Sequence, residues 1–176
     1  ADQAVAVELY AGGNSTLFNN GTIAAYADNY GGIAFRSGDG NDTVLNYGTV
    51  YGAIVTYGGD DSFVNGVGAT WDVFGTSDMG DGDDAILNAG TINMHDAVID
   101  LGLPGAAGNS FVNYDTITVS GAYNIIDMEG GSAGLLMDAA LAGAPAPLAS
   151  SNPQAFYNFG SIDFRDGEPD DVLTIV

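Results

Sequence analysis

Three segments rich in glycine and aspartate carry the residues best suited to chemistry, at positions 38–42, 58–61 and 80–84. Their carboxylates belong to Asp39, Asp42, Asp60, Asp61, Asp81, Asp83 and Asp84. Calcium is held by about six to eight hard oxygen atoms, and aspartate carboxylates together with glycine carbonyls supply such atoms. These aspartates are therefore a candidate calcium (Ca2+) site.

The spacing of the three segments suits a coiled fold with one acidic edge. Asp42, Asp61 and Asp84 are 19 and 23 residues apart, so they could stack on one edge of three successive turns. The first and third segments match the Gly-x-Gly-x-Asp core of the calcium-binding nonapeptide found in RTX-like turns. The alternative interpretation is that glycine and aspartate occur there for turn geometry alone. The sequence leaves both interpretations open.

The chain offers few of the residue types from which a catalytic site is built. It has no cysteine, a single histidine (His95) and only two basic residues, Arg36 and Arg165. β-Solenoids can cleave polysaccharides with grouped aspartates. The candidates for that role are Asp72, Asp96, Asp100 and Asp127. Because anionic sugars need basic subsites, the sequence predicts a non-enzymatic protein, with a polysaccharide-active β-helix enzyme as the alternative.

Charge and composition exclude several classes of partner. Two basic residues against 23 acidic ones give a formal net charge of −21 over 176 residues. Such a surface repels phosphate backbones and anionic lipid headgroups, so we expect no nucleic-acid partner and no membrane insertion. With 46% hydrophobic residues the chain has ample material for a core, and we expect a single domain over residues 1–176.

An internal repeat must position these residues. A small residue, two apolar residues and an asparagine recur along the chain. The asparagines are Asn19, Asn46, Asn65, Asn88, Asn113 and Asn158. A Gly-Thr-Ile-like block and a third apolar block follow most copies, so each period of about 19–27 residues holds three short strands. The pattern predicts an all-β, right-handed parallel β-solenoid of about seven three-strand turns, with the asparagines stacked as a hydrogen-bonded ladder.

Residues 131–153 depart from the repeat. They are rich in alanine and proline, and Ala133–Leu141 contains helix formers that Gly143 could terminate. We therefore expect one short helical excursion from a corner of the solenoid.

Both ends of the chain have the pattern of open strands. Residues 5–10 are typical of the third strand of a preceding turn, and residues 171–176 of the first strand of a further turn. Unpaired strands invite strand addition, and a head-to-tail contact that does not close produces a filament. The predicted contact residues are Val5, Val7, Leu9, Val172, Thr174 and Val176.

Two stretches resemble passenger repeats of bacterial autotransporters and related adhesins: Gly-Asp-Gly-Asn-Asp-Thr-Val-Leu-Asn-Tyr-Gly-Thr-Val and Gly-Asp-Gly-Asp-Asp-Ala-Ile-Leu-Asn-Ala-Gly-Thr-Ile. The run Asn158–Phe164 followed by Asp170–Ile175 is similar to the run that opens the C-terminal folding segment of such passengers. The resemblance implies a secreted, extracellular β-solenoid at the cell surface of a Gram-negative bacterium.

The expected function is that of a structural protein. It would self-associate end to end into filaments, or act as a surface adhesin for a host or cell-surface glycan or protein. A calcium-binding module of a longer secreted protein is a further alternative. Outward tyrosines could form an adhesive face: Tyr26, Tyr30, Tyr47, Tyr51, Tyr57, Tyr114 and Tyr123.

Overall fold

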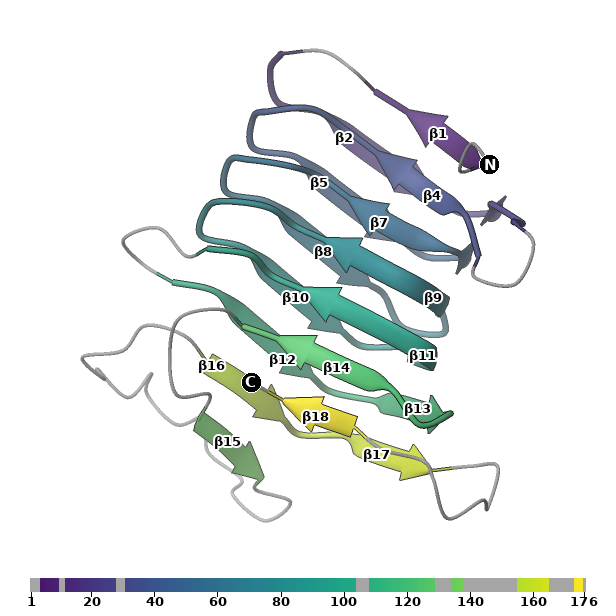
Figure 1. Cartoon of the computed structure of the whole chain (residues 1–176), viewed down its shortest axis with the longest axis vertical. Helices are drawn as coiled ribbons and strands as arrows, with labels where there is room; N and C mark the ends of the chain where they lie inside the picture. Colours follow the sequence, from purple (N-terminus) through teal and green to yellow (C-terminus); the bar gives the residue numbers. More distant parts are fainter. Residues whose placement is uncertain are drawn as a thin grey trace.

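The computed structural model of the chain describes residues 4–9, 12–27, 31–103, 108–128, 134–137, 155–164 and 173–175. These residues form β-strands joined by turns and bends, and the strands stack into a parallel β-solenoid (Figure 1). No helix occurs among them, and hence none that is long and apolar enough to cross a membrane. The all-β class predicted from the repeat is confirmed.

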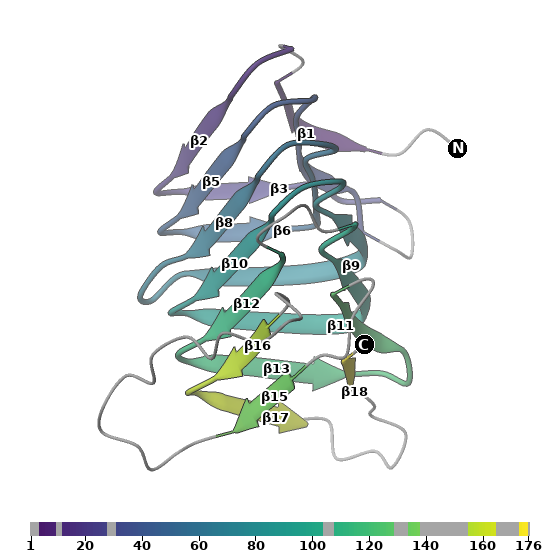
Figure 2. The same ribbon diagram turned by 90° about the vertical axis from the view of Figure 1, so that its left-hand side faces the viewer.

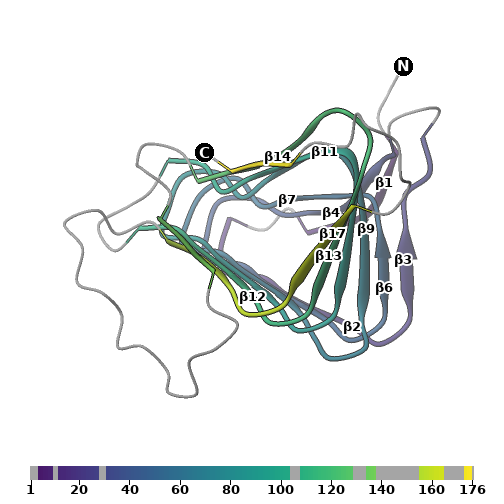
Figure 3. The ribbon, with the colours of Figure 1, turned by 90° about the horizontal axis from the view of Figure 1, so that it is seen from below.

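The strands lie on three faces of the coil, which we call face A, face B and face C (Figure 3). Face A consists of β2 (Thr16–Asn19), β5 (Thr43–Asn46), β8 (Ser62–Asn65), β10 (Ala85–Asn88), β12 (Ser110–Asn113), β16 (Ala155–Asn158) and β15 (Gly134–Met137), stacked in that order. Face B contains β3 (Thr22–Ala24), β6 (Thr49–Tyr51), β13 (Thr116–Ser120) and β17 (Ser161–Phe164). Face C contains β1 (Val5–Glu8), β4 (Ile33–Arg36), β7 (Ala53–Val55), β14 (Asn124–Asp127) and β18 (Leu173–Ile175).

Two long strands join face B to face C. They are β9 (Thr70–Asp78) and β11 (Thr91–Asp100), whose first halves pair on face B and whose second halves pair on face C. Seen from the C-terminal end, the chain runs counterclockwise as it approaches the viewer, so the coil is right-handed (Figure 3).

The coil has fewer turns than the sequence predicts. Five consecutive turns run from β2 to β14, and β16, β17 and β18 each add one more strand to a face. The expectation of seven turns is therefore wrong. Its cause is the stacking of β12 directly on β16, where Asn113 Nδ2 donates to Asn158 Oδ1 at 2.6 Å across 45 residues. That interval holds one turn and an insertion rather than two turns.

Strand alternation sends the first apolar residue and the asparagine of each face A strand inwards. The apolar members form much of the buried core: Val44, Phe63, Ile86, Phe111 and Phe156. The asparagine ladder is confirmed, because each Nδ2 from Asn19 to Asn113 donates to the next Oδ1 at 2.6–2.8 Å. The asparagines end the strands of face A, at the corner with face B that Figure 2 shows, and their bonds hold successive turns in register.

The predicted helix over Ala133–Leu141 is wrong where the structure describes it. Gly134–Met137 is strand β15, which pairs with β16 so that Met137 lies opposite Asn158. Helix propensity is a weak preference, and the open side of β16 offers a full row of backbone partners. The rest of 131–153 lies outside the described residues.

The two terminal strands occupy the same face. β1 pairs with β4 on face C, as expected for a third strand. β18 pairs with β14 and is also a third strand, so the prediction that residues 171–176 begin a new turn is wrong. β17 already fills the preceding place on face B. Thr174 is exposed in β18, and Val172 and Val176 lie outside the described residues.

Candidate functional site

The candidate aspartates lie where the chain turns from face C back to face A. We call this region the acidic edge. It consists of residues 37–42, 56–61, 79–84, 101–103 and 108–109. Its turns bond to one another as strands do, with the Gly40 N–H donating to Gly58 O at 2.6 Å and the Gly59 N–H to Asp81 O at 2.8 Å. The edge is therefore a continuation of the stacked sheets.

Each of these turns requires a glycine at one position. Gly40, Gly59 and Gly82 have φ angles of 128°, 122° and 155°, which L side chains rarely adopt. A Cβ atom at Gly82 would lie 1.9 Å from Gly59 O. The glycines of the Gly-x-Gly-x-Asp pattern thus serve the close stacking of one turn on the next.

An inner ladder of side chains runs along the acidic edge. Its members are Asp42, Asp61, Asp84 and Asn109, each at most 2% exposed. Asp61 Oδ1 accepts the Asp42 N–H at 2.7 Å, and Asp84 Oδ1 accepts the Asp61 N–H at 2.8 Å. Asn109 Oδ1 accepts the Asp84 N–H at 2.9 Å. The Oδ2 atoms of the three aspartates are buried without a hydrogen-bond partner among the described residues.

Two members of the inner ladder, Asp61 and Asp84, bind protons more readily than free aspartates do. Burial raises the pKa of Asp84 to about 7 and that of Asp61 to about 6, because a carboxylate loses its hydration there. The backbone N–H that each accepts lowers its pKa, and neighbouring carboxylates raise it again. At neutral pH the ladder therefore carries less than its full negative charge.

An outer ladder lies one residue earlier in each turn. Asn14 Oδ1 accepts the Asn41 N–H at 2.9 Å, and Asn41 Oδ1 accepts the Asp60 N–H at 3.0 Å. Asp60 Oδ1 accepts the Asp83 N–H at 3.0 Å, and Asp83 Oδ1 accepts the Gly108 N–H at 2.6 Å. Since only an oxygen acceptor is needed at these positions, asparagine and aspartate serve equally well.

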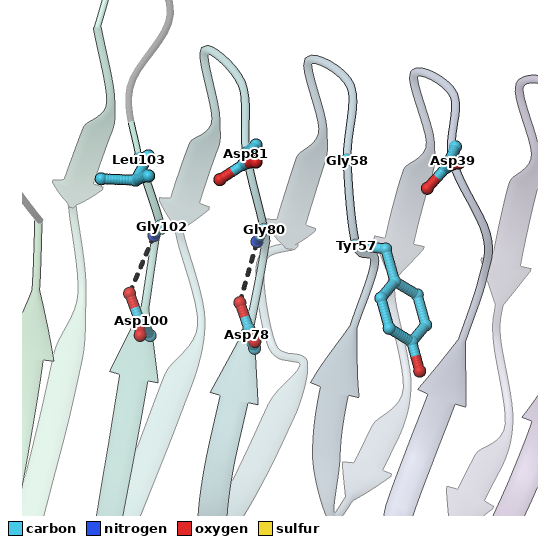
Figure 4. Close-up of a pocket in the computed structure, with 9 residues that line it drawn as sticks. All are labelled: Asp39, Tyr57, Gly58, Asp78, Gly80, Asp81, Asp100, Gly102 and Leu103. Atoms are coloured by element: carbon cyan, nitrogen blue, oxygen red, sulfur yellow. Dashed lines mark hydrogen bonds between the residues drawn. The ribbon is translucent and has the colours of Figure 1, made fainter.

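A shallow open groove of about 410 Å³ lies beside the ladders (Figure 4). Asp39 and Asp81 border it from the turns, and Asp78 and Asp100 border it from the ends of β9 and β11. Asp78 Oδ1 accepts the Gly80 N–H at 2.9 Å, and Asp100 Oδ1 accepts the Gly102 N–H at 2.8 Å. Sequence reasoning missed Asp78 in this role. The signal was the Asp-x-Gly spacing at the end of a strand, which is typical of a side chain bonding to its own turn.

The structure separates the predicted calcium ligands into three groups. Asp42, Asp61 and Asp84 belong to the inner ladder, Asp60 and Asp83 to the outer ladder, and Asp39 and Asp81 to the groove. Over the ranges that the structure describes, no three histidine, aspartate or glutamate side chains converge as ligands of a metal ion do. Calcium binding at the acidic edge stays a prediction.

The aspartates of the enzymatic alternative lie in different places. Asp100 and Asp127 are neighbours on face C. Asp72 lies on face B, where its Oδ1 accepts a hydrogen bond from Asn93 at 2.6 Å. Asp96 occupies the bulge of β11, with a φ of 46°.

His95 belongs to an aromatic column on face B. Successive ring centroids of Tyr26, Tyr51, Phe74 and His95 are 4.5–4.8 Å apart. His95 Nδ1 lies 2.7 Å from Ser120 Oγ, and burial lowers the pKa of His95. The column ends at Tyr26, which is 72% exposed, so its aromatic surface is open at that end.

Comparison with known proteins found no matching family model, no similar curated protein and no similar solved structure. The acidic edge has two physical capacities: its side chains bond successive turns together, and its inner ladder takes up protons near neutral pH.

Proposed function

We propose that the chain is a non-enzymatic structural protein whose copies stack end to end into filaments. The open edges of the coil support this proposal. β1 and β18 lie at opposite ends of face C, and each pairs on one side only among the described residues. Such an edge presents a row of backbone donors and acceptors that another strand can satisfy.

The main support for the proposal is that the hydrophobic core is incompletely covered at both ends of the coil. Several hydrophobic residues pack on the core while remaining only partly buried, and all belong to the terminal turns. They are Val7, Leu9, Leu17 and Ile23 at one end, and Ile162, Leu173 and Ile175 at the other. Their equivalents in the middle of the coil, such as Val50 and Ile92, are 1% exposed or less. A second copy stacked on the end would bury those on faces A and C as an internal turn does: Val7, Leu9, Leu17, Leu173 and Ile175.

The two ends have complementary steps on faces A and C (Figure 1), whereas face B, which ends in β3 and β17, has one strand fewer. At the N-terminal end, β1 extends face C one strand further than β2 and β3 extend faces A and B. At the C-terminal end, β15 extends face A one strand further than β17 and β18 extend faces B and C. β1 of a second copy can therefore lie against β18 while its β2 lies against β15, with all strands parallel. The predicted contact residues Val5, Val7 and Leu9 would then face Thr174 across the junction.

A proline at the free edge tests the stacking. Ala4 O accepts the Ile33 N–H at 2.7 Å, so by alternation the Val5 N–H points away from β4. Val5→Pro removes that outward donor and keeps the pairing with β4. The matched control is Val67→Pro, because Val67 is 84% exposed at the second position of a turn closed by the Ala69 N–H to Gly66 O bond.

Sedimentation velocity over a concentration series measures the outcome. We expect the wild type and Val67→Pro to form species that grow with concentration, and Val5→Pro to remain a single small species with an unchanged melting temperature. A wild-type chain that sediments as a monomer at all concentrations, with or without calcium, would reject end-to-end stacking.

The proposed location is outside the cell, at the bacterial surface. The resemblance of the repeats to autotransporter passengers supports it. Fractionation of cells that express the protein from its own gene, with immunodetection in the surface and cytoplasmic fractions, tests it. Recovery from the cytoplasm alone would contradict the proposal.

A further inference from the structure

Face B has an open edge beside β17. Face A continues past β16 to β15, whereas β17, which follows β16 along the chain, pairs only with β13 among the described residues. The backbone N–H and C=O groups on its other edge can therefore bond to one more strand. At this edge Ile162 packs on the core but is only partly buried, whereas its equivalents Ile92 and Ile117 are fully buried. A strand added there should turn an apolar residue towards the core.

The repeat indicates which residues can reach this edge. Six strands of face A end in asparagine, and after five of them the next strand of face B begins three residues later. β15 ends at Met137, which pairs with Asn158 in the asparagine position. The same step of three residues leads from Met137 to Ala140. In the register of β15 with β16, residues 140–142 would lie opposite residues 161–163 of β17, with Leu141 opposite Ile162.

We propose that residues 140–142, Ala-Leu-Ala, bind along the open edge of β17 as the last strand of face B, which we call the added strand. The composition of the segment suits this place. Leu141 would turn inwards beside Ile162, as the middle residue of a strand of face B does. Residues 139–143 carry no charge, so the acidic surface of the chain does not repel them.

The precedent of β15 and the length of the chain both permit this addition. β15, Gly-Leu-Leu-Met, has no β-branched residue and still pairs along the whole of β16, so an open edge of this coil accepts such a run. After residue 142, residues 143–154 remain for the return to β16. Twelve extended residues span about 40 Å, whereas a face of four or five residues is about 15 Å wide.

The added strand would give face B the same step as faces A and C. In the proposed stack, β2 of the next copy lies against β15 and its β1 lies against β18, which leaves room for one strand between β17 and β3 of that copy. Residues 140–142 would occupy this room, so that all three faces continue through the junction. The binding to β17 takes place within one copy and does not require stacking, whereas this role at the junction rests on the proposed function.

A disulfide between positions 140 and 161 detects the added strand within one copy. In paired parallel strands the two Cα atoms would lie about 4.8 Å apart, which a disulfide accepts. The chain has no cysteine, so one variant combines Ala140→Cys with Ser161→Cys, and the control combines Ala140→Cys with Thr91→Cys. Thr91 lies in the same outward column of face B as Ser161, two strands away. In dilute solution under mild oxidation we expect the first variant to form an intramolecular disulfide at least tenfold faster than the control. Equal rates for the two variants would overturn the proposal.

A charge at residue 141 gives a second measurement. Leu141→Asp places a carboxylate where the added strand should face the core, and Leu148→Asp makes the same change outside the added strand. We expect Leu141→Asp to slow disulfide formation between positions 140 and 161 at least tenfold, and Leu148→Asp to leave its rate unchanged. Filaments of the wild type together with slow disulfide formation would reject the added strand and leave end-to-end stacking intact. Rapid disulfide formation in a chain that stays monomeric would reject stacking and leave the added strand intact.

Discussion

Asp84→Asn should stabilise the protein above neutral pH and bring no gain at pH 5. Asp84 Oδ1 accepts the Asp61 N–H at 2.8 Å, and an amide oxygen can keep this bond, as Asn109 does on the next turn. What the substitution removes is a buried carboxylate whose Oδ2 has no hydrogen-bond partner among the described residues.

The magnitude follows from the raised pKa of Asp84. Burial moves that pKa from 3.8 to about 7. One pKa unit corresponds to about 1.4 kcal/mol, so ionising Asp84 in the folded chain costs about 4 kcal/mol. The new amide nitrogen is buried without an acceptor, which costs about 1–3 kcal/mol. The net gain at pH 8 is then about 1–3 kcal/mol, or a rise in Tm of roughly 3–10 °C for a chain of this length.

The sign of the pH dependence follows from linkage. Below pH 3.8 Asp84 is protonated in both the folded and the unfolded chain, so no buried charge at Asp84 destabilises the folded wild type. As the pH rises towards about 7 the unfolded chain releases this proton first, so the stability of the wild type falls through that window. The variant has no such group, and its loss of stability over the same window is smaller.

Circular dichroism melts at pH 5 and pH 8 measure the effect. Asp81→Asn is the control, because it removes an exposed carboxylate from the same turn. We expect Asp84→Asn to melt above the wild type at pH 8 only, and Asp81→Asn to change Tm little at either pH. A variant that melts below the wild type at pH 8, or shows the same shift at both pH values, would refute the burial argument.

Three further outcomes are expected from the same melts. Asn65→Ala removes ladder bonds of 2.8, 2.8 and 3.0 Å and should cost about 2–4 kcal/mol; a loss under 1 kcal/mol would contradict the ladder's role. Gly80→Ala should prevent folding or lower Tm severely, because the new Cβ would lie 1.0 Å from Tyr57 O and because Gly80 has a φ of 89°. Gly12→Ala is the control and should be neutral, because there is open space around Gly12. If the acidic edge binds calcium, millimolar calcium should raise Tm relative to a chelator. An equal rise in Tm with magnesium would mean that the cations only screen the negative charges, and would contradict a calcium site.

The sequence predicts the strands well because their signal is local. A small–apolar–apolar–asparagine run alternates sides along a strand, and asparagines that recur once in each period are expected to stack, as the bonds from Asn19 to Asn158 confirm. The number of turns was not predictable in this way. The interval between Asn113 and Asn158 is compatible with two turns or with one turn and an insertion, and only the pairing of β12 with β16 decides. The Gly-Leu-Leu-Met run of β15 also fits the repeat, with methionine at the asparagine position, yet its composition favours a helix.

The sequence predicts where the candidate site lies, but not the role of each aspartate in it. Stacked periods bring Asp42, Asp61 and Asp84 to one edge, as their spacing along the chain predicts. Which neighbour turns inwards depends on the backbone after each glycine, so the division between Asp60 outside and Asp61 inside follows from φ angles that the sequence does not specify.

Electron microscopy of the purified chain tests end-to-end stacking most directly. Face A of one copy holds seven strands, so a stack repeats every seven strand spacings, or about 34 Å. We expect filaments with that axial repeat for the wild type, and short isolated rods for Val5→Pro. Isolated rods for the wild type at high concentration, or filaments that persist unchanged in Val5→Pro, would contradict it.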